Sequence, residues 1–223
     1  MTTACLGIDV QCSRGCPYVV VTDDLRPQES GWLRLPTELP PIVARLREHF
    51  TRVGVGIDAP RRPLPSPREH YWKGHAWRSR RPTDRGHGRH CEVIIKALGL
   101  ANPQWTPTMG SFPDWMQVGF QLFGSLSGQA DIYEVFPSAA YAQLAESADA
   151  LVSISLKGFV HGPKDMLDAY VAAYTVQQYL AGRGAAVGDG DGLGAIILPR
   201  PVDAQPTALF TWPRGEEPPP QNV

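Results

Sequence analysis

The chain has 223 residues, which is long enough for one α/β domain with a well-buried core. With 43% hydrophobic residues, 19% charged residues and a formal net charge of −1, its composition is that of an ordinary soluble globular protein. No apolar run reaches the ~18 residues of a membrane helix and no secretory signal opens the chain, so we expect a cytoplasmic protein without a membrane partner.

The first third of the chain predicts a three-stranded meander followed by a crossover. Largely apolar runs at 5–10, 18–23 and 31–35 are separated by turn-forming residues, which is typical of antiparallel strands. Residues 37–50 carry apolar side chains at helical spacing, and 53–58 form another apolar strand. This order of a strand, a helix and a buried strand predicts a parallel connection within one sheet.

Helices and strands alternate in the rest of the chain. After a basic insert at 59–89, the pattern predicts helices at 90–99, 115–126, 138–147 and 162–182 and strands at 130–137 and 192–199. Residues 1–199 therefore predict an α/β three-layer domain, with a mixed sheet and helices on both faces. The Pro-rich, polar segment 200–223 is expected to be a disordered or loosely draped tail.

Positive charge is concentrated in the insert 59–89. It holds nine Lys and Arg residues against two acids, although the whole chain is nearly neutral. Such a segment, interleaved with Tyr71, Trp72 and Trp77, predicts contact with DNA or RNA, with cations at phosphates and aromatic rings stacked on bases. The alternative is a solvated loop whose aromatic side chains pack on the core. The candidate nucleic-acid contacts are Arg61, Arg62, Lys73, Arg78, Arg80, Arg81 and Arg85.

Several acids occupy comparable places relative to the predicted sheet. Asp9 and Asp58 each end an apolar strand after Gly-Ile, and Glu134 stands near the end of a third strand. The carboxyl ends of parallel strands are where open α/β sheets hold ligands, so we expect these side chains at one edge. Asp165 and Asp168 are three residues apart and share a face of the longest predicted helix, beside small alanines.

Gathered carboxylates repel one another unless a divalent cation lies among them, and Mg²⁺ and Mn²⁺ prefer such oxygen ligands. Asp9, Asp58, Glu134, Asp165 and Asp168 are therefore candidate metal ligands, and all except Asp165 are candidate catalytic residues. Two metal ions would activate a water and stabilise the leaving oxygen in phosphodiester hydrolysis. In the competing interpretation these acids only begin turns or, for Asp165, favour the positive end of a helix dipole.

Six short motifs follow one another along residues 4–199, namely LGIDV, VGIDAP, GRHCE, YEVFPSAAY, KDMLDAYVAAY and GAIILP. Their order resembles the predicted RNase H-like nuclease family catalogued as domain of unknown function number 429. The resemblance implies a ribonuclease H-like fold, with acids on the first strand, on the fourth strand and on a late helix. These acids correspond to Asp9, Asp58 and Asp168, and Glu134 matches that family's Glu-Val-x-Pro acid.

Arg89, Cys91 and Glu92 match the Arg-x-Cys-acid signature of the same family, and the residues themselves do not reveal its role. The chain departs from the family in the insert 59–89, which is longer and more basic than a compact member would have. This departure leaves the role of the insert open.

The favoured function is a metal-dependent hydrolase that cleaves nucleic-acid phosphodiesters with Mg²⁺ or Mn²⁺. One alternative is a phosphotransferase or ATPase of the actin-like kind, which shares this type of sheet. Against it, the stretch GIDVQCSRG lacks the Gly/Thr/Ser-rich phosphate turn expected after the first strand. Another alternative is a non-catalytic nucleic-acid-binding module that retains the fold.

Overall fold

The computed structural model describes residues 2–126, 128–145 and 163–213. Its centre is a seven-stranded sheet with the strand order β3-β2-β1-β4-β7-β9-β8. The strands are β1 (Thr3–Asp9), β2 (Cys16–Val21), β3 (Pro27–Leu33), β4 (Arg52–Asp58), β7 (Asp131–Val135), β8 (Ala185–Val187) and β9 (Ile196–Leu198). A separate hairpin pairs β5 (His70–Trp72) with β6 (Trp77–Ser79) inside the basic insert.

The first half of the sheet has the predicted topology. β1 pairs with β2 and β2 with β3, both antiparallel, so the meander is confirmed. Helix α1 (Leu39–His49) then crosses over, and β4 returns in parallel beside β1. β7 and β9 continue in parallel, and β8 closes the edge in the antiparallel sense. The sequence did not predict β8, because three residues are too few to show a periodic pattern.

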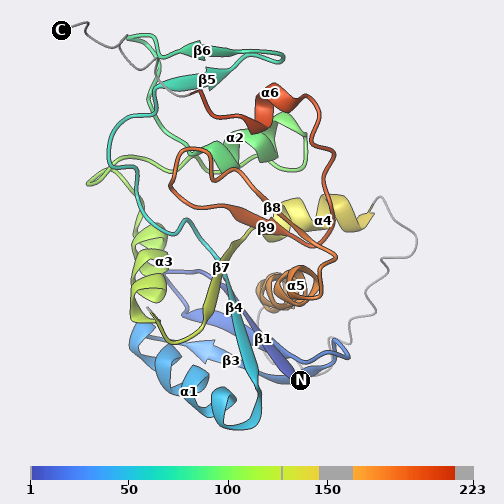
Figure 1. Cartoon of the computed structure of the whole chain (residues 1–223). Coiled ribbons are helices and arrows are strands. Elements are labelled where there is room, and N and C mark those ends of the chain that lie inside the picture. The colour runs from blue at the N-terminus through green and yellow to red at the C-terminus, as the bar shows by residue number, and fades with distance from the viewer. Residues whose placement is uncertain (1, 127, 146–162, 214–223) are drawn as a thin grey trace, which may run out of the picture.

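Helices cover both faces of the sheet (Figure 1). Besides α1 they are α2 (His90–Ala97), α3 (Asp114–Ser125), α4 (Pro137–Ala145), α5 (Pro163–Leu180) and α6 (Thr207–Phe210). α1 and α3 pack on one face, where Leu46 and Leu122 join the core, and α5 packs on the other through Val176. The predicted α/β three-layer arrangement is therefore confirmed. None of the described helices is long and apolar enough to cross a membrane.

Two glycines allow α5 to lie directly against the sheet. A Cβ atom on Gly7 would lie 2.1 Å from the carbonyl oxygen of Ala169 and 2.2 Å from the nitrogen of Ala173. A Cβ atom on Gly56 would lie 3.0 Å from the carbonyl oxygen of Ala172. Gly7 and Gly56 are register partners on β1 and β4, so they form one surface without side chains. The alanine-lined face of α5 rests on this surface.

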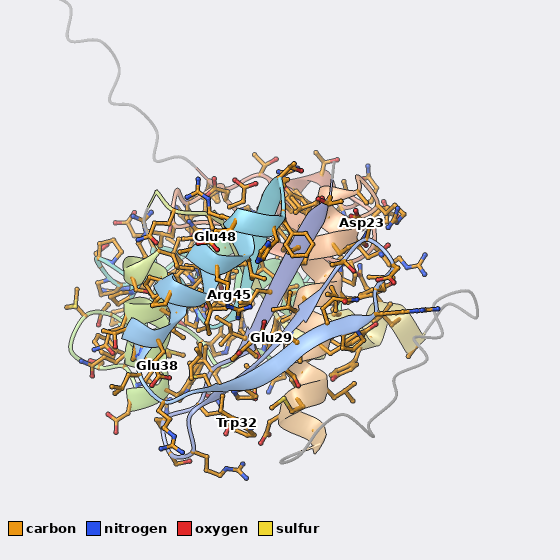
Figure 2. The ribbon with its side chains drawn as sticks, turned by 90° about the horizontal axis from the view of Figure 1, so that it is seen from below. Asp23, Glu29, Trp32, Glu38, Arg45 and Glu48 are labelled. Carbon is orange, nitrogen blue, oxygen red and sulfur yellow. The ribbon has the colours of Figure 1, made fainter. Side chains whose placement is uncertain are left out.

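An ion pair connects α1 to β3 at the sheet edge farthest from β8. Glu29 of β3 accepts hydrogen bonds at 2.7 and 2.8 Å from one guanidinium nitrogen of Arg45, and another at 2.7 Å from the hydroxyl of Tyr18. Figure 2 looks at this part of the molecule and shows Arg45 on α1 lying over Glu29. This contact fixes α1 over the meander, away from the carboxyl ends of β4 and β7.

Residues 200–213 differ from the tail that the sequence predicts. Helix α6 buries Leu209, whose carbonyl oxygen lies 2.9 Å from Nε2 of His90 in α2. The ring of Trp212 packs against His90 with a centroid distance of 5.1 Å. The prediction is wrong here because a few apolar side chains anchor a segment that is otherwise polar and Pro-rich. Residues 214–223 lie outside the described part of the chain.

Candidate functional site

Asp9 and Asp58 are the last residues of β1 and β4 and are partners in the parallel register of these strands. Side chains alternate between the two faces of a sheet, and Gly7 and Gly56, two residues earlier, face α5. Both carboxyl groups are therefore directed to the α5 side. Asp9 is buried and Asp58 is half-buried. The structure brings these two predicted site residues together at one edge of the sheet.

Helix α5 supplies the third and fourth predicted acids. Asp168 is buried, and its carboxylate accepts a hydrogen bond at 2.7 Å from the hydroxyl of Tyr141 and another at 2.6 Å from the ammonium group of Lys164. Asp165 lies one turn earlier and forms an ion pair at 3.2 Å with the exposed Arg14. Asp168 is therefore the inner of the two helix acids, and Asp165 lies at the rim.

The acids of this cluster change one another's ionisation. The pKa of Asp9 is raised to about 6, mainly by burial. The negative charges of Asp168 and Asp165 add to this increase, and a hydrogen bond from Gln11 opposes it. Burial also raises the pKa of Asp58 well above its usual range, with further increases from Asp9 and Asp168. Carboxyl groups in this situation resist ionising together, and a bound cation would remove that resistance.

The carboxylates of Asp9 and Asp168 already accept hydrogen bonds from neighbouring side chains. Lys164 binds Asp168, and Nε2 of Gln11 donates to Asp9 at 2.8 Å. Within the described ranges, no three acidic, histidine or cysteine side chains are placed to hold a metal ion as they stand. The donors are nevertheless carboxylate oxygens, which suit Mg²⁺ and Mn²⁺. As the side chains stand, Lys164 and Gln11 occupy carboxylate oxygens that a cation would need.

Glu134 is held differently from the other acids, although its charge also raises the pKa of Asp58 and both residues line one cavity. It is the register partner of Ile57, so its side chain points to the α1 and α3 face and not to the α5 side. Both of its carboxylate oxygens accept hydrogen bonds from Arg89, one of them at 2.7 Å, and the backbone N–H of Arg61 donates at 3.0 Å. The assignment of Glu134 as a metal ligand and catalytic acid therefore stays a prediction, and as the side chains stand Arg89 binds both of its carboxylate oxygens.

Arg89 is the centre of a buried ion-pair network, with only 1% of its surface exposed. Glu92 accepts a hydrogen bond at 3.0 Å from the Arg89 guanidinium and another at 3.0 Å from the backbone N–H of Thr106. Cys91 instead packs in an apolar cluster, and burial raises the pKa of its thiol well above its usual range. In the Arg-x-Cys-acid motif, Arg89 and Glu92 therefore form the polar network, and the unreactive thiol of Cys91 only packs in the core.

A cavity of about 410 Å³ opens at the carboxyl ends of β4 and β7. Asp58, Arg89 and Glu134 line its polar side, and the rings of Trp115 and Phe136 line its walls. Its volume lies in the usual range of small-ligand sites. Asp58 therefore belongs to two neighbouring features, the acid cluster on the α5 side and this cavity.

Three of the seven predicted nucleic-acid contacts are bound within the fold. Arg61 donates at 2.7 Å to the carbonyl oxygen of Ile132, and Arg62 donates to a backbone carbonyl in the turn before β9. Arg78 forms two hydrogen bonds with Asp84, at 2.6 and 2.8 Å. The other four side chains are exposed and are Lys73, Arg80, Arg81 and Arg85.

The aromatic residues of the insert pack inward. The ring of Trp77 contacts Trp72 and Trp212 with centroid distances of 5.3 and 5.1 Å, and its Nε1 donates to a backbone carbonyl of α6. Tyr71 stacks with the Arg68 guanidinium at 4.1 Å. The structure therefore agrees with the alternative in which these rings pack on the core, and their stacking on bases stays a prediction.

Sequence reasoning missed two residues that hold Asp168. Lys164 stands four positions before Asp168 on α5, a spacing that brings opposite charges together on a helix, so this signal was available. Tyr141 reaches Asp168 from α4, and a contact between two helices leaves no local pattern in the sequence.

Comparison of the chain with models of known protein families, with curated proteins and with solved structures gave no match in any of the three. Membership of the RNase H-like nuclease family therefore stays a prediction. The function has to be inferred from the geometry of the site.

Proposed function

We propose that this protein is a Mg²⁺- or Mn²⁺-dependent nuclease with a ribonuclease H-like fold, which hydrolyses phosphodiester bonds in DNA or RNA. The observation that carries the proposal is the cluster of Asp9, Asp58 and Asp168 at one sheet edge, where burial and mutual repulsion raise the pKa of Asp9 and Asp58. Such a cluster opposes folding as long as its charges are unbalanced, so a site for divalent cations is a physical reason for its presence.

The arrangement of the sheet supports the fold assignment. β1, β2 and β3 form an antiparallel meander, and β4 and β7 add in parallel on the other side of β1. The three acids stand on the first strand, the fourth strand and a late helix, which are the positions that the family resemblance implies. Membership of the family is not needed for the chemistry, because the donors and their placement are properties of this chain.

Each residue of the cluster has a distinct task in this proposal. Asp9, Asp58 and Asp168 hold the metal ions, and Asp165 adds a carboxylate at the rim. Bound Mg²⁺ or Mn²⁺ would supply an activated water and stabilise the leaving oxygen. The Tyr141 hydroxyl fixes one oxygen of Asp168, which leaves the other oxygen, now bound by Lys164, for a cation.

In this proposal, exposed Lys and Arg side chains of the insert bind the phosphate groups of the substrate. The β5–β6 hairpin lies at the end of the molecule opposite α1 (Figure 1). Lys73 lies between the two strands of this hairpin, and Arg80, Arg81 and Arg85 follow it in the chain. All four side chains are exposed and available to phosphates. The proposal therefore assigns phosphate contact to these four residues only.

A cleavage assay tests the proposal. End-labelled single-stranded, duplex and branched DNA and RNA are incubated with Mn²⁺ and with the wild type or with D9N, D58N or D168N. We expect cleavage by the wild type and its loss in all three variants. The matched control is D131N, which changes an exposed acid at the opposite end of β7 and should cleave normally.

Three outcomes would contradict the nuclease proposal. Cleavage that survives in all three variants would mean that the acid cluster is not the active site. ATP turnover without cleavage of any nucleic acid would favour the actin-like phosphotransferase instead. A protein that binds nucleic acid but never cleaves it would be the non-catalytic module.

A further inference from the structure

We infer that the cavity beside Asp58 takes one unpaired nucleobase of the substrate strand. The inference depends on the proposed nuclease function and names its substrate class, which is a strand whose base next to the scissile phosphate is not paired. It is drawn from the charge of the cavity, the rings that line its walls, and Asp58, which belongs both to the cavity and to the acid cluster.

The charge of the cavity excludes a phosphate group. Arg89 is the only basic residue among the described residues that line the cavity. All three of its guanidinium nitrogens are engaged by acids, since Nε donates to Glu92, Nη1 to Glu134 and Nη2 to both. Asp58 adds a further acid to the same lining. A cavity with more acids than bases repels a phosphate and accepts a neutral group that carries N–H donors.

The walls suit a flat ring. Trp115, at the start of α3, and Phe136, directly after β7, are half-buried and both line the cavity. The rings of Pro60 and Pro103 add two more rigid surfaces. Stacking of a base on aromatic side chains is tolerant of sequence, because every base presents a π-face. At about 410 Å³ the cavity is of the size of sites for small organic groups.

Polar groups at the opening complement the edge of a base. Asn102, Gln104 and Ser138 line the cavity and have exposed side chains. Amide and hydroxyl groups both donate and accept hydrogen bonds, which is what the edge of a base requires. Asp58 belongs to this lining and to the acid cluster, so a base in the cavity is attached close to a phosphate at the acids.

The test compares two substrates that differ only by one base. A short fluorescein-labelled single strand with all its bases is compared with the same strand carrying an abasic nucleotide at the cleavage position. Binding is measured by fluorescence anisotropy and cleavage by KM and kcat in Mn²⁺. We expect the abasic strand to bind roughly tenfold more weakly, the size of effect typical of one stacked base.

Variants of the cavity should remove this difference. Trp115→Ala and N102A/Q104A are expected to bind both strands alike, and the second variant changes only exposed side chains, so it keeps the fold intact. The matched control is Phe112→Ala, which removes an aromatic ring just before α3 that does not line the cavity. This control should still distinguish the two strands.

Equal binding and equal KM for the two strands would overturn the inference. Loss of cleavage with every substrate, together with retained discrimination in binding, would overturn the nuclease proposal and leave the cavity assigned to a base. The experiment therefore distinguishes a failure of the base-binding inference from a failure of the nuclease proposal.

Discussion

Asp9 and Asp58 are register partners at the ends of β1 and β4, and two residues before them Gly7 and Gly56 are register partners as well. The two Gly-Ile-Asp sequences therefore have a joint structural role. The glycines form the surface on which α5 rests, and the acids stand just beyond it. Because α5 lies so close, its Asp168 is near both strand-end acids and affects the pKa of each.

Gly7→Ala is expected to destabilise the protein and weaken the site. The added Cβ atom would meet the backbone of α5 at 2.1 Å, so the helix must shift. Overpacking of this kind costs about 1–3 kcal/mol in the free energy of unfolding. The control is Gly124→Ala in α3, where a Cβ atom meets nothing within 4 Å and helix propensity predicts a gain of about 1 kcal/mol. Urea unfolding of the two variants measures both effects, and an unchanged or increased free energy of unfolding in Gly7→Ala would contradict the close packing of α5.

Most of the fold could be predicted because its central elements are apolar and regularly spaced. The strands that contain Asp9 and Asp58, the crossover helix α1 and the long helix α5 all lie where the sequence places them. The three-residue strands β5, β6 and β8 could not be predicted, since they are defined by their pairing partners and not by a pattern of their own. Helix α6 was missed because its anchoring depends on tertiary contacts with α2.

The acids of the site were predicted less evenly. Asp9, Asp58 and Asp168 could be identified because strand ends and helix faces follow from periodicity. The face that Glu134 takes could not be predicted, because the register with β4, and not the sequence, decides it. Arg89 and Glu92 could not be assigned a role, since the network that they form joins α2 to β7 across the fold.

Removal of the Lys164 ammonium should strengthen metal binding. In Lys164→Met the Asp168 carboxylate loses its 2.6 Å partner and is free for a cation. Lys164 itself is exposed, and solvent weakens its ion pair to roughly 0.2–1 kcal/mol, so Mn²⁺ affinity should rise several-fold and the free energy of unfolding should hardly change. Arg45→Met breaks a comparable pair with Glu29 at the far edge of the sheet (Figure 2) and should leave Mn²⁺ affinity unchanged. Calorimetric titration with Mn²⁺ measures both, and equal affinities in wild type and Lys164→Met would count against the role of Lys164.

The metal-free protein should show the cost of the buried Asp9. Its pKa is about 6 in the folded protein against a usual value of 3.8, so the folded state binds the proton more tightly than the unfolded state. The contribution of Asp9 to stability is therefore present at low pH and is lost as the pH rises through about 6. Since one pKa unit corresponds to about 1.4 kcal/mol, this loss amounts to up to about 3 kcal/mol.

Asp9→Asn has no such carboxyl group to ionise. The free energy of unfolding of this variant, relative to wild type, should therefore increase between pH 4 and pH 7 in the presence of EDTA, by up to about 3 kcal/mol. Denaturant unfolding at a series of pH values measures the difference. D131N should track the wild type, and a constant difference between D9N and wild type would mean that Asp9 is not ionising in a buried site.

The exposed cations of the insert should determine how salt affects nucleic-acid binding. Each phosphate contact with a single strand contributes about 0.7 to the slope of log affinity against log salt. Neutralising Arg80, Arg81 and Arg85 to Gln should therefore lower the slope by about 2. Arg26 and Arg34 are exposed on the meander side of the sheet, and their Gln variants should keep the wild-type slope. An unchanged slope in the first variant would reduce the insert to a solvated loop.

The central claim is that Asp9, Asp58 and Asp168 together hold divalent cations. Titration of the protein with Mn²⁺, followed by the electron paramagnetic resonance signal of the free ion, tests it most directly. The wild type and D131N are expected to bind Mn²⁺ saturably, and D58N to bind at least about tenfold more weakly, since even the loss of a residue that only supports a ligand has an effect of this size. Equal Mn²⁺ binding by wild type and D58N, or the absence of saturable binding in both, would contradict the claim.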